Sequence, residues 1–193
     1  MRFKIFVLSL FFILTSCADS LDKNLQLEAD EQVVEDLSFF EYRAKAAKYL
    51  IIHCTATDPK YPWSAQRLTD FFKKERKWNR LGYNYYITQD GEIHALTPIN
   101  NDSIVNFDEL TYNASGLNSV SFAISLEGGS QLYKGKLIDA DNFTENQKIS
   151  LVYLVGVIKG FAPSVKIIPH NSVNKGKSCP VMKIDFLNYE QQG

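Results

Sequence analysis

The chain has little net charge and few cysteines. Its 21 basic and 22 acidic side chains leave a formal net charge of −1, so it lacks the basic face that nucleic-acid binding normally needs. Cysteines occur only at positions 17, 54 and 179, an odd number that does not indicate a disulfide framework. With 193 residues, 45% of them hydrophobic and 22% charged, the composition is typical of one globular domain with a substantial core.

The apolar run at the N-terminus is short. Arg2 and Lys4 precede a run from Ile5 to Leu14, and its roughly ten apolar residues are too few to span a bilayer but are typical of a secretory signal. The run ends in Leu-Thr-Ser-Cys17, which resembles a bacterial lipobox, where cleavage before the cysteine leaves a residue that carries lipid. We therefore expect residues 1–16 to be a lipoprotein signal peptide and Cys17 to be lipidated. The alternative is an ordinary secretory signal with an incidental cysteine.

Residues 17–45 are predicted to link the lipid to the folded domain. They are rich in acidic and amide side chains, with too few apolar positions to demand packing. A solvated acidic tether is the preferred interpretation, and an interaction helix ending in Phe39 and Phe40 is the alternative. Ala18 follows Cys17, in place of the aspartate that marks inner-membrane retention in some bacteria. The expected location is the periplasm of a Gram-negative bacterium, anchored to the outer membrane.

Residues 46–193 alternate between strand and helix patterns. Short apolar or aromatic runs predict strands over Tyr49–Ile52, Tyr83–Thr88, Glu92–Leu96, Val120–Leu126 and Ile167–Ile168. Asp90-Gly91 predicts a tight hairpin between the second and third of these. The interleaving indicates an α/β domain with a single central mixed sheet flanked by helices.

Three helices are predicted from their caps. Ser64 can cap a helix over residues 65–78. Thr144 and Gln147 form a capping box for a helix over residues 145–159, and Asp185 can cap a short last helix. The residues of the 145–159 helix expected to be available for burial are Ile149, Val152, Val155 and Ile158. Residues 97–119, rich in Asn, Asp and Ser, are predicted to form a long surface loop.

Two of the three histidines follow apolar strands. His53 comes directly after Tyr49–Ile52, and His170 nearly follows Ile167–Ile168, whereas His94 lies within the hairpin. If the two strands are neighbours, their ends converge and Cys179 can return beside them. Two imidazoles and one thiolate suit zinc and leave a fourth position for water, the arrangement of a catalytic site. A hydrogen-bonded histidine at a strand end and an incidental loop cysteine are the alternative.

Short motifs in a fixed order carry a family resemblance. The motifs are Ile51–Thr57, Gly82–Ile87 followed by Asp90-Gly91, Ala114–Asn118, Leu126–Gly129, Phe143-Thr144 with Gln147, and His170 with Lys177–Pro180. Together they resemble the zinc N-acetylmuramoyl-L-alanine amidases, the family of phage T7 lysozyme and the animal peptidoglycan recognition proteins. The resemblance extends over about residues 48–187.

The resemblance implies a site and a substrate. His53, His170 and Cys179 match the family's ligands of one zinc ion, and Tyr83 and Lys177 match residues that assist catalysis. Which of these two moves the proton to the leaving amine is left open. The bond implied is the amide between N-acetylmuramic acid and L-alanine of the stem peptide, in intact peptidoglycan or in muropeptides. Wall remodelling or recycling by a monomeric enzyme is the expected role.

Two positions depart from the family pattern. Asn84 and Asn113 stand where the family has histidines, and both are expected near bound substrate. An asparagine can exchange hydrogen bonds but cannot act as a general base. A non-catalytic peptidoglycan-binding or protective protein on the same fold is therefore the alternative function. Cys179 favours the enzyme, since non-catalytic relatives usually lack the metal-binding cysteine.

Overall fold

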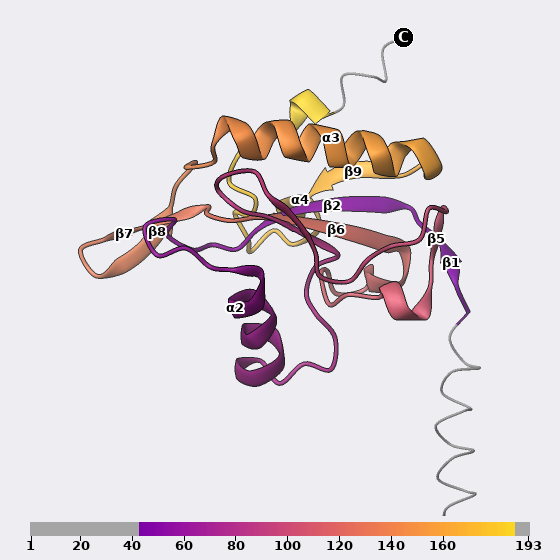
Figure 1. Cartoon of the computed structure of the whole chain (residues 1–193), viewed down its shortest axis with the longest axis horizontal. Helices are drawn as coiled ribbons and strands as arrows, with labels where there is room; N and C mark the ends of the chain where they lie inside the picture. The colour runs from indigo at the N-terminus through magenta and orange to yellow at the C-terminus, as the bar shows by residue number, and fades with distance from the viewer. Residues whose placement is uncertain (1–42, 188–193) are drawn as a thin grey trace, which may run out of the picture. The chain divides into compact units, whose positions relative to one another are not determined.

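The computed structural model describes residues 43–187 of the chain (Figure 1). The predicted signal peptide, Cys17 and nearly all of the predicted tether lie outside the described residues. Within the described range, no helix combines the length and apolarity needed to cross a membrane.

A five-stranded sheet organises the domain. Its strands are β2 (Tyr49–Cys54), β3 (Tyr85–Ile87), β4 (Ile93–Ala95), β6 (Ser121–Leu126) and β9 (Lys166–Pro169), in the spatial order β4-β3-β6-β2-β9. β6 runs parallel to β2 and β3, β9 runs parallel to β2, and β4 pairs antiparallel with β3. The predicted mixed sheet flanked by helices is confirmed.

Alternate residues of β2 and β6 face opposite sides of this sheet. One set joins the main apolar core, namely Leu50, Ile52, Cys54, Phe122, Ile124 and Leu126. The intervening residues face the other side, and among them His53 pairs directly with Ser125. Because side chains alternate with a period of two along a strand, the same two strands supply both a core face and a polar face.

Helix α3 (Glu145–Phe161) covers the core face (Figure 1). The predicted capping box of Thr144 and Gln147 is present, with hydrogen bonds in both directions. The residues of α3 that are buried are Gln147, Leu151, Leu154, Val155 and Ile158. The expectation for Ile149 and Val152 is wrong, since they are 67% and 50% exposed. Gln147 explains the difference, because its amide donates to the carbonyl oxygens of Ile87 and Glu127 and so sets the rotation of the helix about its axis.

Helix α2 (Ala65–Asp70) lies on the opposite side of the sheet from α3 (Figure 1). Ser64 caps it as predicted, accepting a hydrogen bond from the Arg67 N–H. The predicted end at residue 78 is too late, because the helix continues only as a π-helical turn, Phe71–Glu75. Phe72 on this turn packs with Leu68 and Tyr86 against the polar side of the sheet. The ring approaches Gly82 so closely that a Cβ there would lie 2.5 Å from it.

Residues 97–119 are more structured than predicted. Strand β5 (Ile104–Val105) pairs antiparallel with β1 (Lys45–Ala46), and 3₁₀ turns form at Phe107–Glu109 and Asn118–Val120. Glu109 is buried, and its carboxylate accepts hydrogen bonds from the backbone N–H groups of Asn100 and Asn106. The segment is therefore held to the domain by long-range contacts, which its Asn- and Ser-rich composition does not reveal.

A hairpin of β7 (Ser130–Tyr133) and β8 (Lys136–Asp139) was not expected from the sequence. It extends from one end of the sheet (Figure 1). Residues 185–187 form a short 3₁₀ turn at the place predicted for the last helix.

Candidate metal centre

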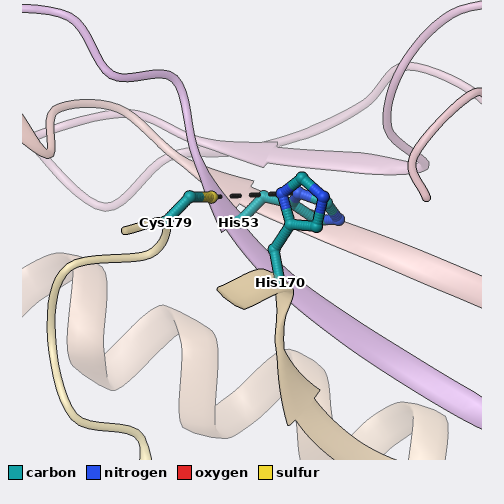
Figure 2. Close-up of side chains that lie close together, drawn as sticks. All are labelled: His53, His170 and Cys179. Atoms are coloured by element: carbon teal, nitrogen blue, oxygen red, sulfur yellow. Dashed lines mark hydrogen bonds between the residues drawn. The ribbon is translucent and has the colours of Figure 1, made fainter. Parts of the chain in front are cut away.

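Two neighbouring parallel strands deliver the histidines. Ile52 of β2 pairs with Pro169 of the parallel strand β9. The next residues along the two strands are therefore His53 and His170. His170 opens the short helix α4 (His170–Val173), and the chain then returns to Cys179. Figure 2 shows the three side chains converging from β2, the end of β9 and the return loop.

The three side chains are close enough to share one ion. The ring centroids of His53 and His170 lie 4.4 Å apart. The Cys179 Sγ lies 3.9 Å from the His53 Nδ1. One donor atom from each residue lies within 4.8 Å of the others. The convergence predicted from the strand ends is thus present in the structure.

Backbone contacts hold the cysteine in this position. The N–H of Asn171 donates to the Cys179 carbonyl oxygen at 2.8 Å, which ties the start of α4 to the return loop. The N–H of Cys54 donates to the Cys179 sulfur at 3.1 Å. The Cys54 side chain itself packs in the core, as its alternation with His53 predicts. It lies against Gly129, where a Cβ would approach its sulfur to 2.5 Å.

The protonation of the two histidines is suited to binding zinc. Burial lowers the pKa of His53 well below its ordinary value, and His170 lowers it further. Burial, and then the charge of Lys177, also lower the pKa of His170. Both imidazoles are therefore neutral, which is the form that binds metals. The His53 Nδ1 lies toward the Cys179 sulfur, whereas its Nε2 is buried without a hydrogen-bond partner among residues 43–187 and needs a partner of its own.

The thiol of Cys179 completes a donor set of two nitrogens and one sulfur, which zinc prefers. The neighbouring Cys54 thiol and burial raise the pKa of Cys179 above its ordinary value. The residues present thus fit one zinc ion, whose charge would favour the thiolate.

Tyr83 and Lys177 lie beside this cluster. Tyr83 directly precedes Asn84 and the start of β3, and its ring centroid is 5.1 Å from that of His53. Burial, followed by the charges of Cys179 and Cys54, raises the pKa of the Tyr83 phenol above its ordinary value, while Ser125 opposes this. Lys177 is exposed on the return loop. Its charge lowers the pKa of His170, after the larger effect of burial.

Asn84 and Asn113 are both buried and hydrogen-bonded within the domain. Asn84 has no exposed surface, and its amide is used by the carbonyls of Thr97 and Glu109 and by the N–H of Ala123. Asn113 is also buried and bonds to the hydroxyls of Thr111 and Ser121. The expected role of these two residues in substrate binding stays a prediction, and in the structure their side chains are used within the domain. Both anchor the 97–119 segment to the sheet.

A row of paired residues crosses the polar face, and its members Tyr86 and Ser125 were not expected from the sequence. Tyr86 pairs with His94 on one side and with Ser125 on the other. Ser125 in turn pairs with His53. The position of Ser125 inside the otherwise apolar run Phe122–Leu126 was the signal that could have identified it.

The comparisons with known proteins identify the family. The family model for N-acetylmuramoyl-L-alanine amidase matches residues 43–181, and the chain belongs to this amidase family. The endolysin of Enterobacteria phage K11 is 28% identical over 146 residues, which cover 73% of this chain and 84% of the relative. The endolysin of Escherichia phage T7 is 30% identical over 133 residues, covering 68% and 78%.

Solved structures share the fold. The Ph2119 endolysin from a Thermus scotoductus bacteriophage superposes with a TM-score of 0.57 at 22% identity, over 77% of this chain and 86% of that one. A variant of Drosophila PGRP-LB in complex with tracheal cytotoxin gives a TM-score of 0.52 at 23% identity, over 72% and 79%. The resemblance read from the motifs is confirmed at the level of family and fold.

Proposed function

We propose that the chain is a zinc-dependent amidase that hydrolyses the bond between N-acetylmuramic acid and L-alanine of the peptidoglycan stem peptide. The cluster of His53, His170 and Cys179 is the observation that carries this proposal, because three converging donors with neutral imidazoles are what a catalytic zinc site requires. Membership of the amidase family supports the choice of bond.

The ligands are held before any metal arrives. His53 lies in the interior of the sheet, and His170 is placed by the strand beside it. The N–H of Cys54 directs the sulfur of Cys179 toward the imidazoles. When bound, zinc supplies an activated water and a Lewis acid for the amide carbonyl. A rigid, preorganised site reduces the reorganisation needed at the moment of reaction.

Lys177 and Tyr83 complete the proposed chemistry. The ammonium of Lys177 and the phenol of Tyr83 can both donate to the carbonyl oxygen as negative charge develops there. The Tyr83 ring is fixed by edge-on packing against Phe72, with centroids 5.4 Å apart. Lys177→Ala should therefore lower the turnover number while leaving zinc content unchanged. Lys175→Ala, which removes another exposed lysine of the same loop, is the matched control.

The direct test measures bound zinc and newly formed L-alanine amino termini after incubation with purified muropeptides and with intact wall. We expect one zinc per chain, and amino termini with the wild type but not with Cys179→Ser. Zinc without amino termini in either protein would instead favour the non-catalytic peptidoglycan-binding alternative.

We also propose that the enzyme is a lipoprotein of the periplasm, anchored through Cys17 to the outer membrane and active in wall remodelling or recycling. The N-terminal motif supports this, and an anchor would keep the domain beside the wall. All three proposed ligands come from one chain, which is compatible with a monomer. Labelled palmitate should be incorporated by the wild type, and Cys17→Ser should release the protein from membranes. A Cys17→Ser protein that stays membrane-bound would contradict the anchor.

A further inference from the structure

Two buried polar atoms without hydrogen-bond partners lie next to each other on the polar face of the sheet. They are the Nε2 of His53 and the Oγ of Ser125, and they are the buried side-chain nitrogen and oxygen atoms without a partner in the described part of the chain. The two residues are 1% and 0% exposed. They are direct partners in the parallel pair β2–β6, so their side chains leave the same face of the sheet at the same level.

Leaving both groups unpaired would be costly. A buried donor or acceptor without a partner destabilises the folded state by about 1–3 kcal/mol, and such groups are rare in folded proteins. The strand partner of Ser125 on its other side is not available to it. Tyr86, the partner of Ser125 on its other side, already donates its hydroxyl to the Trp63 carbonyl oxygen at 2.7 Å.

We propose that Ser125 is a positioning residue whose hydroxyl accepts a hydrogen bond from Nε2–H of His53, directly or through one buried water. This bond selects the tautomer in which Nδ1 carries the lone pair. Nδ1 is the ring atom that lies 3.9 Å from the Cys179 sulfur. Ser125 thus orients the His53 ring so that Nδ1 faces the proposed metal centre. The inference rests on the proposed metal centre and deepens it.

Tyr83 packs near the same histidine, with its ring centroid 5.1 Å from that of His53. A hydroxyl that accepts a hydrogen bond from His53 retains its own proton, so Ser125 can accept from His53 and still donate to a second polar group on this face.

The matched control is Ser121, another buried serine on the same strand and face. Its hydroxyl donates to the Leu117 carbonyl oxygen and contacts Asn113, far from the imidazoles along the strand. Ser121→Ala removes a buried hydroxyl of equal size, so any effect that depends only on stability should appear in it as well. Ser125→Thr keeps the hydroxyl and tests for rescue.

The experiment uses the full chain and two readouts other than activity. Nitrogen-15 shifts of the imidazoles in the metal-free protein at neutral pH report which nitrogen of His53 carries the proton. Competition with a chelator reports zinc affinity. We expect an Nε2–H tautomer in the wild type, and mixed tautomers with about 10- to 100-fold weaker zinc binding in Ser125→Ala. Ser125→Thr should recover both, and Ser121→Ala should change neither.

An Nδ1–H tautomer in the wild type would overturn the proposal, and this measurement needs no variant to fold. Zinc affinity of Ser125→Ala within twofold of the wild type, with the tautomer unchanged, would overturn it as well. Failure of the wild type to bind zinc would instead refute the proposed function, while the tautomer measurement would still decide the hydrogen bond.

Discussion

The two faces of the five-stranded sheet use the same strands in opposite ways. On one face, the side chains of Leu50, Ile52, Phe122 and Ile124 pack against α3 with no exposed surface. On the other, one residue along, the same strands present His53 and Ser125. The core face is apolar and closed, whereas the polar face carries groups that still lack partners.

The difference between the two faces separates the residues that stabilise the fold from those proposed to bind the metal. Full burial of each large aliphatic side chain on the core face stabilises the fold by about 1.5–3 kcal/mol. The polar face lacks part of that stabilisation, but it holds the proposed metal ligands on rigid strands. A change on one face should therefore affect stability with little effect on metal binding, and a change on the other should do the reverse.

The largest effect should come from the ligands on the polar side. Cys179→Ser and His170→Ala should lower cleavage of muropeptides by more than about 100-fold, because the metal activates the attacking water. Both residues are partly exposed, so the unfolding midpoint of the metal-free protein in urea should change little. Activity within a factor of two of the wild type would refute the metal assignment.

The core face should show the reverse pattern. Ile158→Ala removes a buried side chain that contacts the sheet and should lower the free energy of unfolding by about 2–5 kcal/mol. Ile149→Ala, on the exposed side of the same helix, should change it by less than about 0.5 kcal/mol. Denaturant titration measures both, and zinc affinity at low denaturant should stay as in the wild type. Equal losses for the two variants would contradict the observed rotation of α3.

Asn84 tests whether every buried polar residue near the site is functional. Asn84→Ala leaves two carbonyls and one N–H without their partner and should cost about 2–3 kcal/mol of unfolding free energy. Asn101→Ala, at an exposed position of the segment that Asn84 anchors, should be near neutral. A stable Asn84→Ala protein with a raised KM for muropeptides would restore the role in substrate binding that the buried position argues against.

The smallest effect is expected at the start of α3. Thr144→Ala removes the N-cap hydroxyl and should lower the free energy of unfolding by about 1 kcal/mol, whereas Thr144→Ser should keep most of it. Thermal unfolding of the metal-free protein measures both. A loss of zinc affinity in Thr144→Ala would show that the two faces are coupled more tightly than the separation described above allows.

Local patterns carried most of the successful predictions. These predictions depend on residues within a few positions of one another, so they can be made without knowing the fold. They are the caps at Ser64 and Thr144, the turn at Asp90-Gly91 and the period of the central strands. The same locality placed His170 directly after its strand, whereas His53 lies within β2, which runs two residues further than the predicted end at Ile52. Family resemblance then supplied the roles of Tyr83 and Lys177, which remain predictions.

The errors share a different cause. The burial of Asn84, the pairing of β1 with β5 and the rotation of α3 all depend on partners distant in the sequence. The amide of Gln147, for example, finds its acceptors at Ile87 and Glu127, which lie 60 and 20 positions away. Composition alone made residues 97–119 look like a surface loop, because Asn and Ser are also able to satisfy buried backbone groups.

By itself, the sequence determined the fold class, the strand ends from which the histidines emerge and the three residues of the candidate metal centre, because these follow from short-range periodicity and from the scarcity of histidine and cysteine. Only the tertiary structure decided which neighbours each buried polar group meets. It placed Asn84 in the scaffold and Ser125 beside His53, since the pairing of strands across the sheet is set by packing of the whole domain.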